Sequence, residues 1–142
     1  MKTEQSAGGV VFKRKDNKTF ILIAKHSAYH RWVFPKGLIG DKIQNESKED
    51  TALREVQEET GVNGKILYPL KPVIYWYQFE GQKIKKTVYY FVMEYLAGDI
   101  TKHDFEMEDV KWELLENVST KLAFKGDKKV WEEAKLYIQT LF

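Results

Sequence analysis

The chain has 142 residues, the length of one domain with room for a hydrophobic core, and 43% of them are apolar. Its 23 basic and 21 acidic side chains leave a net charge of +2, which argues neither for nor against a polyanionic partner. There is no cysteine, which excludes disulfides, thiolate zinc sites and cysteine nucleophiles. Neither a signal peptide nor an apolar stretch of membrane-spanning length is present, so we expect a single cytoplasmic domain over residues 1–142.

Two short apolar runs near the N-terminus predict a β-hairpin. The runs cover residues 7–12 and 20–24, and the polar residues 15–18 between them are typical of a turn. A third short strand is expected at residues 32–34. It ends before Pro35, because proline has no backbone N–H to donate to a neighbouring strand.

The middle of the chain predicts a helix that begins after Ser47 and runs to about Thr60. A loop over residues 37–45 leads into it, and Ser47 can cap its first turn, with Asp50 three residues later. Gly61 suits the left-handed conformation that commonly ends a helix. The apolar residues of this helix, expected to lie opposite much of its acidic side, are Ala52, Leu53 and Val56.

The second half of the chain predicts another hairpin, a late strand and a final helix. The hairpin strands are residues 73–79 and 87–96 around a turn at residues 80–81, and residues 110–114 form the late strand. Asp127 can cap the final helix. Hairpins mixed with separate helices predict an α+β fold, an α/β/α sandwich with a mixed sheet, in place of a doubly wound parallel sheet. The apolar residues at helical spacing in the last helix are Val130, Ala134, Ile138 and Leu141.

Three glutamates in the first helix are candidates for a metal site. Glu55, Glu58 and Glu59 fall on one stripe of a helix, where like charges repel unless a cation sits among them. Oxygen ligands of this kind suit magnesium, manganese or calcium. A solvated acidic face is the alternative. Arg54 can reach Glu58 one turn later, and no lysine or arginine follows Glu55 or Glu58 at that spacing, which favours the metal site.

The segment around this helix resembles the Nudix box. That pattern is Gly, five residues, Glu, seven residues, Arg-Glu, an apolar residue, any residue, Glu-Glu, any residue, Gly and an apolar residue. Residues 7–10 also resemble the first strand of the family, and residues 32–37 resemble its Trp-x-x-Pro-Lys-Gly lead-in. The resemblance covers nearly the whole chain and implies a Nudix α/β/α sandwich with a loop-helix-loop catalytic box. The fixed positions are filled by Gly40, Glu46, Arg54, Glu55, Val56, Glu58, Glu59, Gly61 and Val62.

One departure from the family pattern lies in the loop before the helix. In most relatives the glycine after Pro-Lys opens the box, but here Gly37 stands three residues too early and Gly40 satisfies the count. Either the loop between Gly37 and Glu46 carries a three-residue insertion, which we favour, or the fit of Gly40 is a coincidence within it. Asn45 then replaces the usual glycine before the glutamate, and asparagine also tolerates a positive φ.

The resemblance implies a magnesium site, with manganese as a substitute. Its ligands would be Glu55, Glu58 and Glu59, joined by the backbone carbonyl of Lys36. Arg54 would orient the glutamates, as the neighbours of metal ligands commonly do. In this family such a site hydrolyses a nucleoside diphosphate linked to another group.

A general base is expected as well, and relatives differ in where it comes from. We choose Glu106, which precedes the late strand on a loop where some relatives carry their base. The alternatives are Glu108 on the same loop, and Glu46 or Glu55 within the box. All four could also be ordinary acids of a surface or a loop.

Residues outside the box are expected to contact the substrate. Lysines can bind phosphates, and tyrosines on one strand face can stack on a base, although surface lysines and core aromatic rings are the plain alternatives. Trp76, on the opposite strand face, is expected in the core. The candidate contacts are Lys36, Gly37, Lys86, Tyr75, Tyr77 and Arg31, the last beside His30.

The strands after the box resemble those of bacterial diadenosine polyphosphate hydrolases. The similar segments are residues 74–77, 86–91 and 124–127. This implies hydrolysis of diadenosine tetraphosphate or a related dinucleoside polyphosphate. Other specificities remain open: oxidised nucleoside triphosphates, ADP-ribose or RNA 5′ ends, or a non-catalytic binding module. The expected partner is a small nucleotide, without a membrane or a specific nucleic acid, and the chain would be a monomer or a homodimer.

Overall fold

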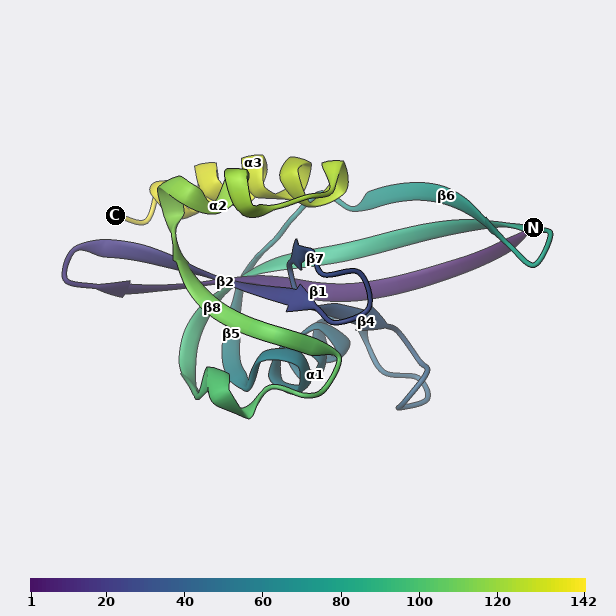
Figure 1. Cartoon of the computed structure of the whole chain (residues 1–142), viewed down its shortest axis with the longest axis horizontal. Coiled ribbons are helices and arrows are strands. Elements are labelled where there is room, and N and C mark those ends of the chain that lie inside the picture. Colours follow the sequence, from purple (N-terminus) through teal and green to yellow (C-terminus); the bar gives the residue numbers. More distant parts are fainter.

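The computed structural model describes residues 1–142 as a mixed eight-stranded sheet with helices on both faces. Figure 1 shows α1 below the sheet and α2 and α3 above it, which confirms the expected α/β/α sandwich. None of the helices is both long and apolar enough to cross a lipid bilayer. The strands are β1 (Lys2–Lys15), β2 (Lys18–His26), β3 (Trp32–Val33), β4 (Lys36–Leu38), β5 (Val62–Pro69), β6 (Val73–Phe79), β7 (Gln82–Gly98) and β8 (Met107–Leu114). The helices are α1 (Lys48–Thr60), α2 (Val118–Lys121) and α3 (Lys125–Gln139), with 3-10 turns at Ile100–Lys102 and Leu115–Asn117.

The sheet is built around β1, which pairs with three strands. Its order is β3-β2-β1-β7-β5, with β4 added to β1, β6 to β7 and β8 to β2. The β1–β2 hairpin confirms the sequence expectation, and Asp16 and Asn17 in its turn take positive φ angles, as a tight two-residue turn requires. Parallel pairing of β1 with β7 runs from Lys2 to Phe12, which is why β1 begins earlier than its apolar run.

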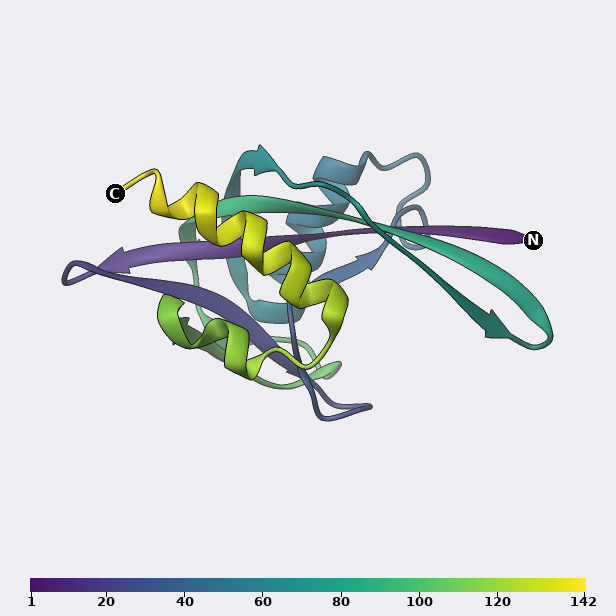
Figure 2. The same ribbon diagram turned by 90° about the horizontal axis from the view of Figure 1, so that it is seen from above.

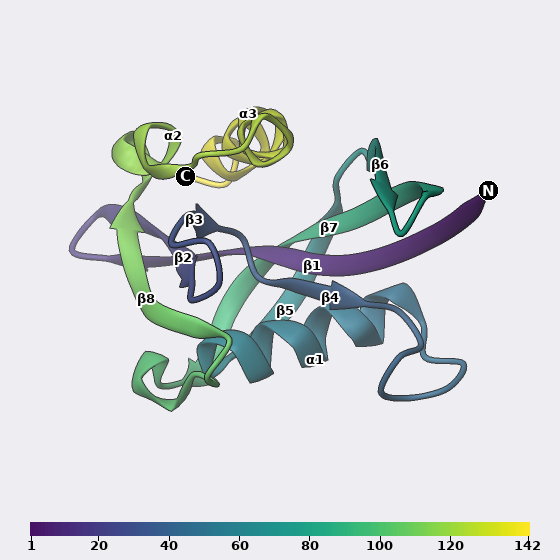
Figure 3. The ribbon, with the colours of Figure 1, turned by 45° about the vertical axis from the view of Figure 1, so that its right-hand side comes forward.

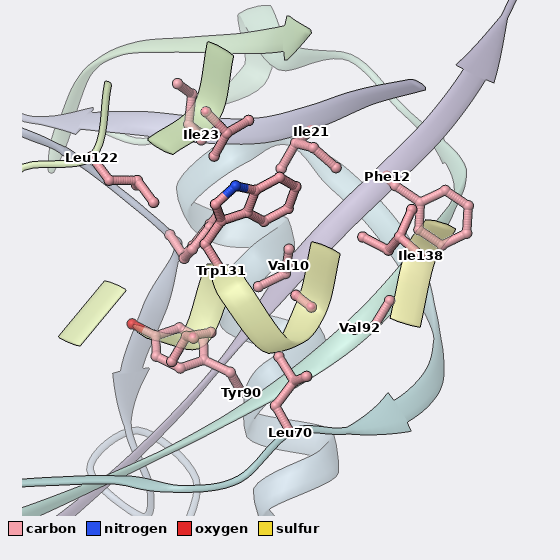
Figure 4. Close-up of a cluster of buried hydrophobic side chains, with 14 of the residues drawn as sticks. Val10, Phe12, Ile21, Ile23, Leu70, Tyr90, Val92, Leu122, Trp131 and Ile138 are labelled. Carbon is pink, nitrogen blue, oxygen red and sulfur yellow. The ribbon is translucent and has the colours of Figure 1, made fainter. Parts of the chain in front are cut away.

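Two buried clusters of apolar side chains hold the helices to the sheet. Alternate residues of β1 point to opposite faces, so Val10 joins the cluster under α3 while Val11 joins the one over α1. Trp131 projects from α3 into the first cluster, between β-strand residues that include Ile21 and Ile23 (Figure 4). In the second cluster Val56 of α1 packs against the sheet.

Several elements differ from the sequence expectation. Strand β5 was not predicted, and β4 overlaps the start of the segment expected to be a loop over residues 37–45. The final helix begins at Lys125 after Phe124, so Asp127 lies in its first turn and does not cap it. Leu141 follows the end of that helix and is 40% exposed, whereas its other predicted apolar residues are buried.

The β6–β7 hairpin forms as predicted, but its aromatic residues pack differently. Trp76 is 48% exposed, so its expected core position is wrong. The hairpin extends past the N-terminal end of α3, and no helix covers that part of the sheet (Figure 2). The Lys83 ammonium instead lies 4.7 Å from the centre of the Trp76 ring, where a cation–π contact shields part of it.

Candidate active site

Helix α1 is delimited by the local signals that the sequence carries. The Ser47 hydroxyl accepts a hydrogen bond from the Asp50 backbone N–H at 3.0 Å, which caps the first turn. At the other end Gly61 takes a φ of 81°, and its N–H bonds to the Gln57 carbonyl. These two ends place the three glutamates on the side of the sheet where β4 passes α1 (Figure 3).

Two of the glutamates are buried, a feature that the sequence pattern did not predict. Glu55 and Glu59 are each 3% exposed and lie on the same side of α1 as Val56. The expectation that the apolar face lies opposite much of the acidic side is therefore wrong. Leu53, expected on that face, is only partly buried. Burying two carboxylates one turn apart is unfavourable unless cations or hydrogen bonds compensate it.

Gly37 allows β4 to approach the Glu55 carboxylate closely. A Cβ atom at position 37 would lie 2.1 Å from the carboxyl carbon of Glu55, far inside van der Waals contact. At Gly40, by contrast, an added Cβ would meet nothing, although its φ of 85° also favours glycine. Asn45 takes a φ of 64°, as expected for the residue that replaces glycine before Glu46.

Arg54 ties three carboxylates together. Its Nη2 lies 2.8 Å from Glu46 Oε1 and its Nε lies 3.0 Å from Glu46 Oε2, a bidentate pair. Its Nη1 donates to Glu55 Oε1 at 2.9 Å and to Glu58 Oε2 at 3.1 Å. The contact with Glu58 confirms the i,i+4 expectation, while the added contact with Glu55 shows that Arg54 does not leave that carboxylate free. Hydrogen bonds from Arg54 lower the pKa of Glu46 below its ordinary value.

Glu46 is a poor geometric candidate for a general base. Both of its carboxylate oxygens are held by Arg54, and the Thr51 hydroxyl donates to Oε1 at 2.8 Å. A carboxylate with its oxygens engaged in this way has little capacity left to take a proton from water. Its position suits the task of holding Arg54 in place.

Lys42 is a component of the site that sequence reasoning missed. It comes from the loop between β4 and α1, and its Nζ lies 2.6 Å from Glu58 Oε2 and 3.6 Å from Glu55 Oε1. Its hydrogen bond to Glu58 raises the pKa of Lys42. Although burial opposes it, the bonds from Lys42 and Arg54 lower the pKa of Glu58. A cation thus already lies beside two of the predicted metal ligands.

Glu59 is the least compensated acid of the site. Burial, followed by the charges of Glu55 and Glu106, raises the pKa of its carboxyl to about 9. The backbone N–H of Lys36 donates to Glu59 Oε1 at 3.3 Å, and this is the one hydrogen bond made by the carboxylate. Burial also raises the pKa of Glu55. A hard divalent cation between these oxygens would offset both penalties, so the donor set fits magnesium or manganese.

The predicted ligands do not converge on a single point in this structure. No group of three acidic or histidine side chains surrounds a position that an ion could occupy. Arg54 and Lys42 hold Glu55 and Glu58, while Glu59 faces Lys36 on the other side. Ion binding would therefore require Lys42 to leave and the glutamate side chains to turn.

Glu106 reaches this site from a loop distant in the chain. It lines the same cavity as Glu55 and Glu59. Ser27 anchors its backbone: the Ser27 Oγ and N lie 2.8 and 2.9 Å from the Glu106 carbonyl oxygen. Glu108 instead pairs with His30 and lies outside the cavity lining. Among the four predicted bases, geometry favours Glu106 over Glu108 and Glu46, and Glu55 is already bound by Arg54.

Two cavities share Tyr29 and Lys36 in their walls, and the first of them also includes Glu55 and Glu59 of the box helix. The first has a volume of about 300 Å³ and is polar; it contains Gly37 and the cations Lys36, Lys42 and Lys86 beside the acids. Burial and the nearby Lys36 lower the pKa of Lys86. The second, of about 610 Å³, is mostly apolar. Its lining includes Tyr29, Val73, Ile74, Tyr75, Val88, Tyr90, Phe124 and Asp127.

The structure brings some predicted substrate residues to these cavities and leaves others outside. Tyr75 lines the apolar cavity, whereas Tyr77 and Arg31 line neither. The Tyr75 and Tyr77 ring centres are 6.4 Å apart, as their strand spacing implied, but the Tyr77 hydroxyl donates to Glu4 Oε1 at 2.5 Å. Tyr29, packed edge-to-face on Phe124 at 5.6 Å, was missed because no local pattern marks it.

Comparison with known proteins shows what this arrangement is similar to. The NUDIX domain family model matches residues 2–134. A Mycobacterium tuberculosis protein whose name describes it as mutator protein MutT4 is 33% identical over 144 residues, 97% of this chain, and the chain spans 57% of that protein. The asymmetrical bis(5′-nucleosyl)-tetraphosphatase of Rattus norvegicus is 28% identical over 142 residues, 94% of this chain and 95% of that protein.

Solved structures give the same fold. The binary complex of a C. elegans Ap4A hydrolase has a TM-score of 0.76 at 20% identity, over 96% of this chain and 98% of that one. The NUDIX domain of Shewanella oneidensis NrtR with ADP-ribose has a TM-score of 0.71 at 23% identity, over 100% of this chain and 90% of that one. The family model spans almost the whole sequence, including the helix that carries the acids of the site. The chain therefore belongs to the NUDIX family of hydrolases.

Proposed function

We propose that this protein hydrolyses a phosphoanhydride bond in a nucleoside diphosphate linked to another moiety, with a divalent metal. The substrate we favour is diadenosine tetraphosphate or a related dinucleoside polyphosphate. One observation carries this choice: a polar cavity with Glu55, Glu59 and Glu106 adjoins an apolar aromatic cavity through Tyr29 and Lys36. Such a pair of cavities suits a charged polyphosphate that ends in a base.

The acids of the site have complementary tasks in this proposal. Glu55, Glu58, Glu59 and the Lys36 carbonyl hold magnesium, or manganese in its place. The bound ion supplies charge neutralisation at the phosphates and activation of water. Glu106 takes the proton of the attacking water as the new phosphorus–oxygen bond forms and the bridging phosphate oxygen leaves. Glu46 keeps Arg54 in position beside the metal ligands.

Substrate binding in this proposal uses both cavities. Lys36 and Lys86, which line the polar cavity, bind the phosphate oxygens. Tyr75 and Phe124 form aromatic walls of the apolar cavity, and an adenine can stack there. The tetraphosphatase name of the rat relative agrees with this choice. Because the similarity is low, ADP-ribose, oxidised nucleoside triphosphates and RNA 5′ ends are the competing substrates.

The proposal also includes the domain organisation, the location, the oligomeric state and the partner of the protein. Residues 1–142 would act as one catalytic domain, in the cytoplasm, as a monomer or a homodimer. Its partner would be a small nucleotide, without a membrane or a specific nucleic acid.

A substrate panel tests the proposed specificity. We expect kcat/KM with magnesium to be highest for diadenosine tetraphosphate, compared with ADP-ribose, 8-oxo-dGTP and 5′-triphosphate RNA. Excess EDTA should abolish the activity, because the acids alone cannot neutralise the phosphates. A tenfold preference for ADP-ribose would reject the dinucleoside polyphosphate and keep the hydrolase. Full turnover in EDTA would reject the metal-dependent mechanism.

A further inference from the structure

Asp127 is the one buried acid of the protein that lies outside the Nudix box. It is 7% exposed, and Glu55 and Glu59 are the other two acids that are buried. It sits in the first turn of α3, at the wall of the apolar cavity. A carboxyl in such a place costs free energy of folding unless it is paired or has a task. The N-terminal end of a helix favours an acid, but does not require it to be buried.

The hydrogen bonding of Asp127 leaves one carboxylate oxygen available. The Tyr90 hydroxyl donates to Asp127 Oδ1 at 3.3 Å, and this is the only hydrogen bond to the side chain. No fully buried side-chain oxygen in the protein lacks a partner. The second oxygen of Asp127 is therefore not fully buried. Because the residue is only 7% exposed and lines the cavity, we infer that this oxygen faces the cavity.

The surroundings of this oxygen define what it can bind. The cavity wall combines aromatic rings, among them Tyr29, Tyr75 and Phe124, with the aliphatic side chain of Val88. Asp127 is the only acid in that wall. The cationic side chains of the wall are lysines, which can donate hydrogen bonds but cannot accept them. An aromatic heterocycle with an N–H group on its edge would fill the apolar space and give the carboxylate a donor.

We propose that Asp127 is a specificity-determining residue, which accepts a hydrogen bond from the exocyclic amine of the adenine in the apolar cavity. This inference rests on the proposed function, because it places the base of the nucleotide in that cavity. Tyr90 positions the carboxyl group through its own hydrogen bond. A base without the amine leaves the oxygen desolvated and unpaired, so it binds more weakly.

Removal of the amine from the ligand and of the carboxylate from the protein tests this directly. Calorimetry compares the binding of adenosine monophosphate with that of purine riboside monophosphate, which lacks only the 6-amino group. The wild type should bind the adenosine nucleotide roughly tenfold or more tightly, as a hydrogen bond to a charged group implies. Asp127→Leu should bind both nucleotides equally, and Asp127→Asn, which keeps one acceptor, should show a reduced preference.

Matched measurements distinguish recognition of the amine from a merely structural role of Asp127. Glu132→Gln, an exposed position on the same helix, should keep the wild-type preference. A structural role would weaken the binding of both nucleotides alike and leave their affinity ratio unchanged in Asp127→Asn. Equal binding by the wild type, or an intact preference in Asp127→Leu or Asp127→Asn, would overturn the proposal. Failure of the wild type to hydrolyse dinucleoside polyphosphates would reject the proposed function, whereas the binding ratio would still decide on Asp127.

Discussion

At the scale of single residues, the site is a balance between buried acids and the cations around them. Arg54 and Lys42 compensate Glu55 and Glu58, but Glu59 has one backbone N–H and a pKa raised to about 9. Two of the acids that the family pattern marks, Glu55 and Glu59, thus have pKa values that burial raises, as expected for carboxylates that a cation would stabilise.

Substitution of the proposed metal ligands should abolish turnover without unfolding the protein. Glu58→Gln and Glu59→Gln should each lower kcat by roughly two orders of magnitude or more, because neutral amides bind a hard cation poorly. Circular dichroism should be unchanged, since glutamine has the shape of glutamate. Glu49→Gln, an exposed acid in the first turn of α1, is the matched control. Near-wild-type hydrolysis in both ligand variants would rule out the metal site.

Lys42 is expected to compete with the metal. Lys42→Met removes the ammonium that lies 2.6 Å from Glu58, so an incoming ion has no cation to displace. Because Lys42 is largely exposed, the gain should be modest, and manganese should bind roughly two- to fivefold more tightly. Electron paramagnetic resonance of Mn²⁺ measures this affinity without any substrate. Unchanged binding would mean that Lys42 does not compete with the metal, and weaker binding would mean that it supports the loaded site.

At the scale of elements, β4 and α1 approach closely where Gly37 meets Glu55. Gly37→Ala should move the carboxylate or the strand, lower kcat and destabilise the protein by about 1–3 kcal/mol, because the new Cβ would lie 2.1 Å from the Glu55 carboxyl carbon. In Gly40→Ala the new Cβ meets no atom. This variant should lose only about 1 kcal/mol of stability, because alanine is strained in the left-handed backbone conformation. Urea unfolding and steady-state kinetics compare the two. A larger loss of activity in Gly40→Ala would reverse the assigned roles of these glycines.

Asp127, in the first turn of α3, should make the stability of the protein depend on pH. Burial raises the pKa of Asp127 from about 3.8 to about 6, so its contribution to stability is full below pH 3.8 and is lost as the pH rises through 6. Asp127→Asn does not titrate, so relative to the wild type it should gain about 2 to 3 kcal/mol of unfolding free energy between pH 4 and pH 7. Urea titrations at the two pH values measure this difference. A constant difference would show that the folded-state pKa is ordinary.

The sequence predicted the elements whose signals are local. Helix α1 carries its own cap and glycine stop, at Ser47 and Gly61, and both hairpins carry turn residues. Strand β5 escaped because its residues form no alternating pattern, and it exists through pairing with β7. Trp76 was misplaced because strand periodicity does not say which sheet face a helix covers.

The residues of the candidate site likewise divide into those that a local sequence signal predicts and those that it does not. The box acids follow from a contiguous motif, whereas Lys42, Ser27 and Tyr29 are loop residues that act through contacts with other segments of the chain. Such contacts depend on tertiary structure, for which the sequence carries no spacing rule. Burial of Glu55 and Glu59 likewise depends on the path of β4 along α1.

At the scale of the whole molecule, the sandwich brings four segments of the chain to one place. Helix α1 supplies the box acids, the loop before β8 supplies Glu106, and β4 with β7 supplies Lys36 and Lys86. The apolar cavity lies beside them, between β6, β7 and the start of α3. The layered fold therefore positions a polyphosphate and its base together.

The most direct test is a crystal structure with manganese and a non-hydrolysable diadenosine tetraphosphate analogue, with anomalous data to locate the metal. We predict a peak about 2.0–2.3 Å from oxygens of Glu55, Glu58 and Glu59, with Lys42 turned away and the phosphates beside Lys36 and Lys86. A bound nucleotide with no peak at these carboxylates, and Lys42 still paired with Glu58, would contradict the metal-dependent mechanism.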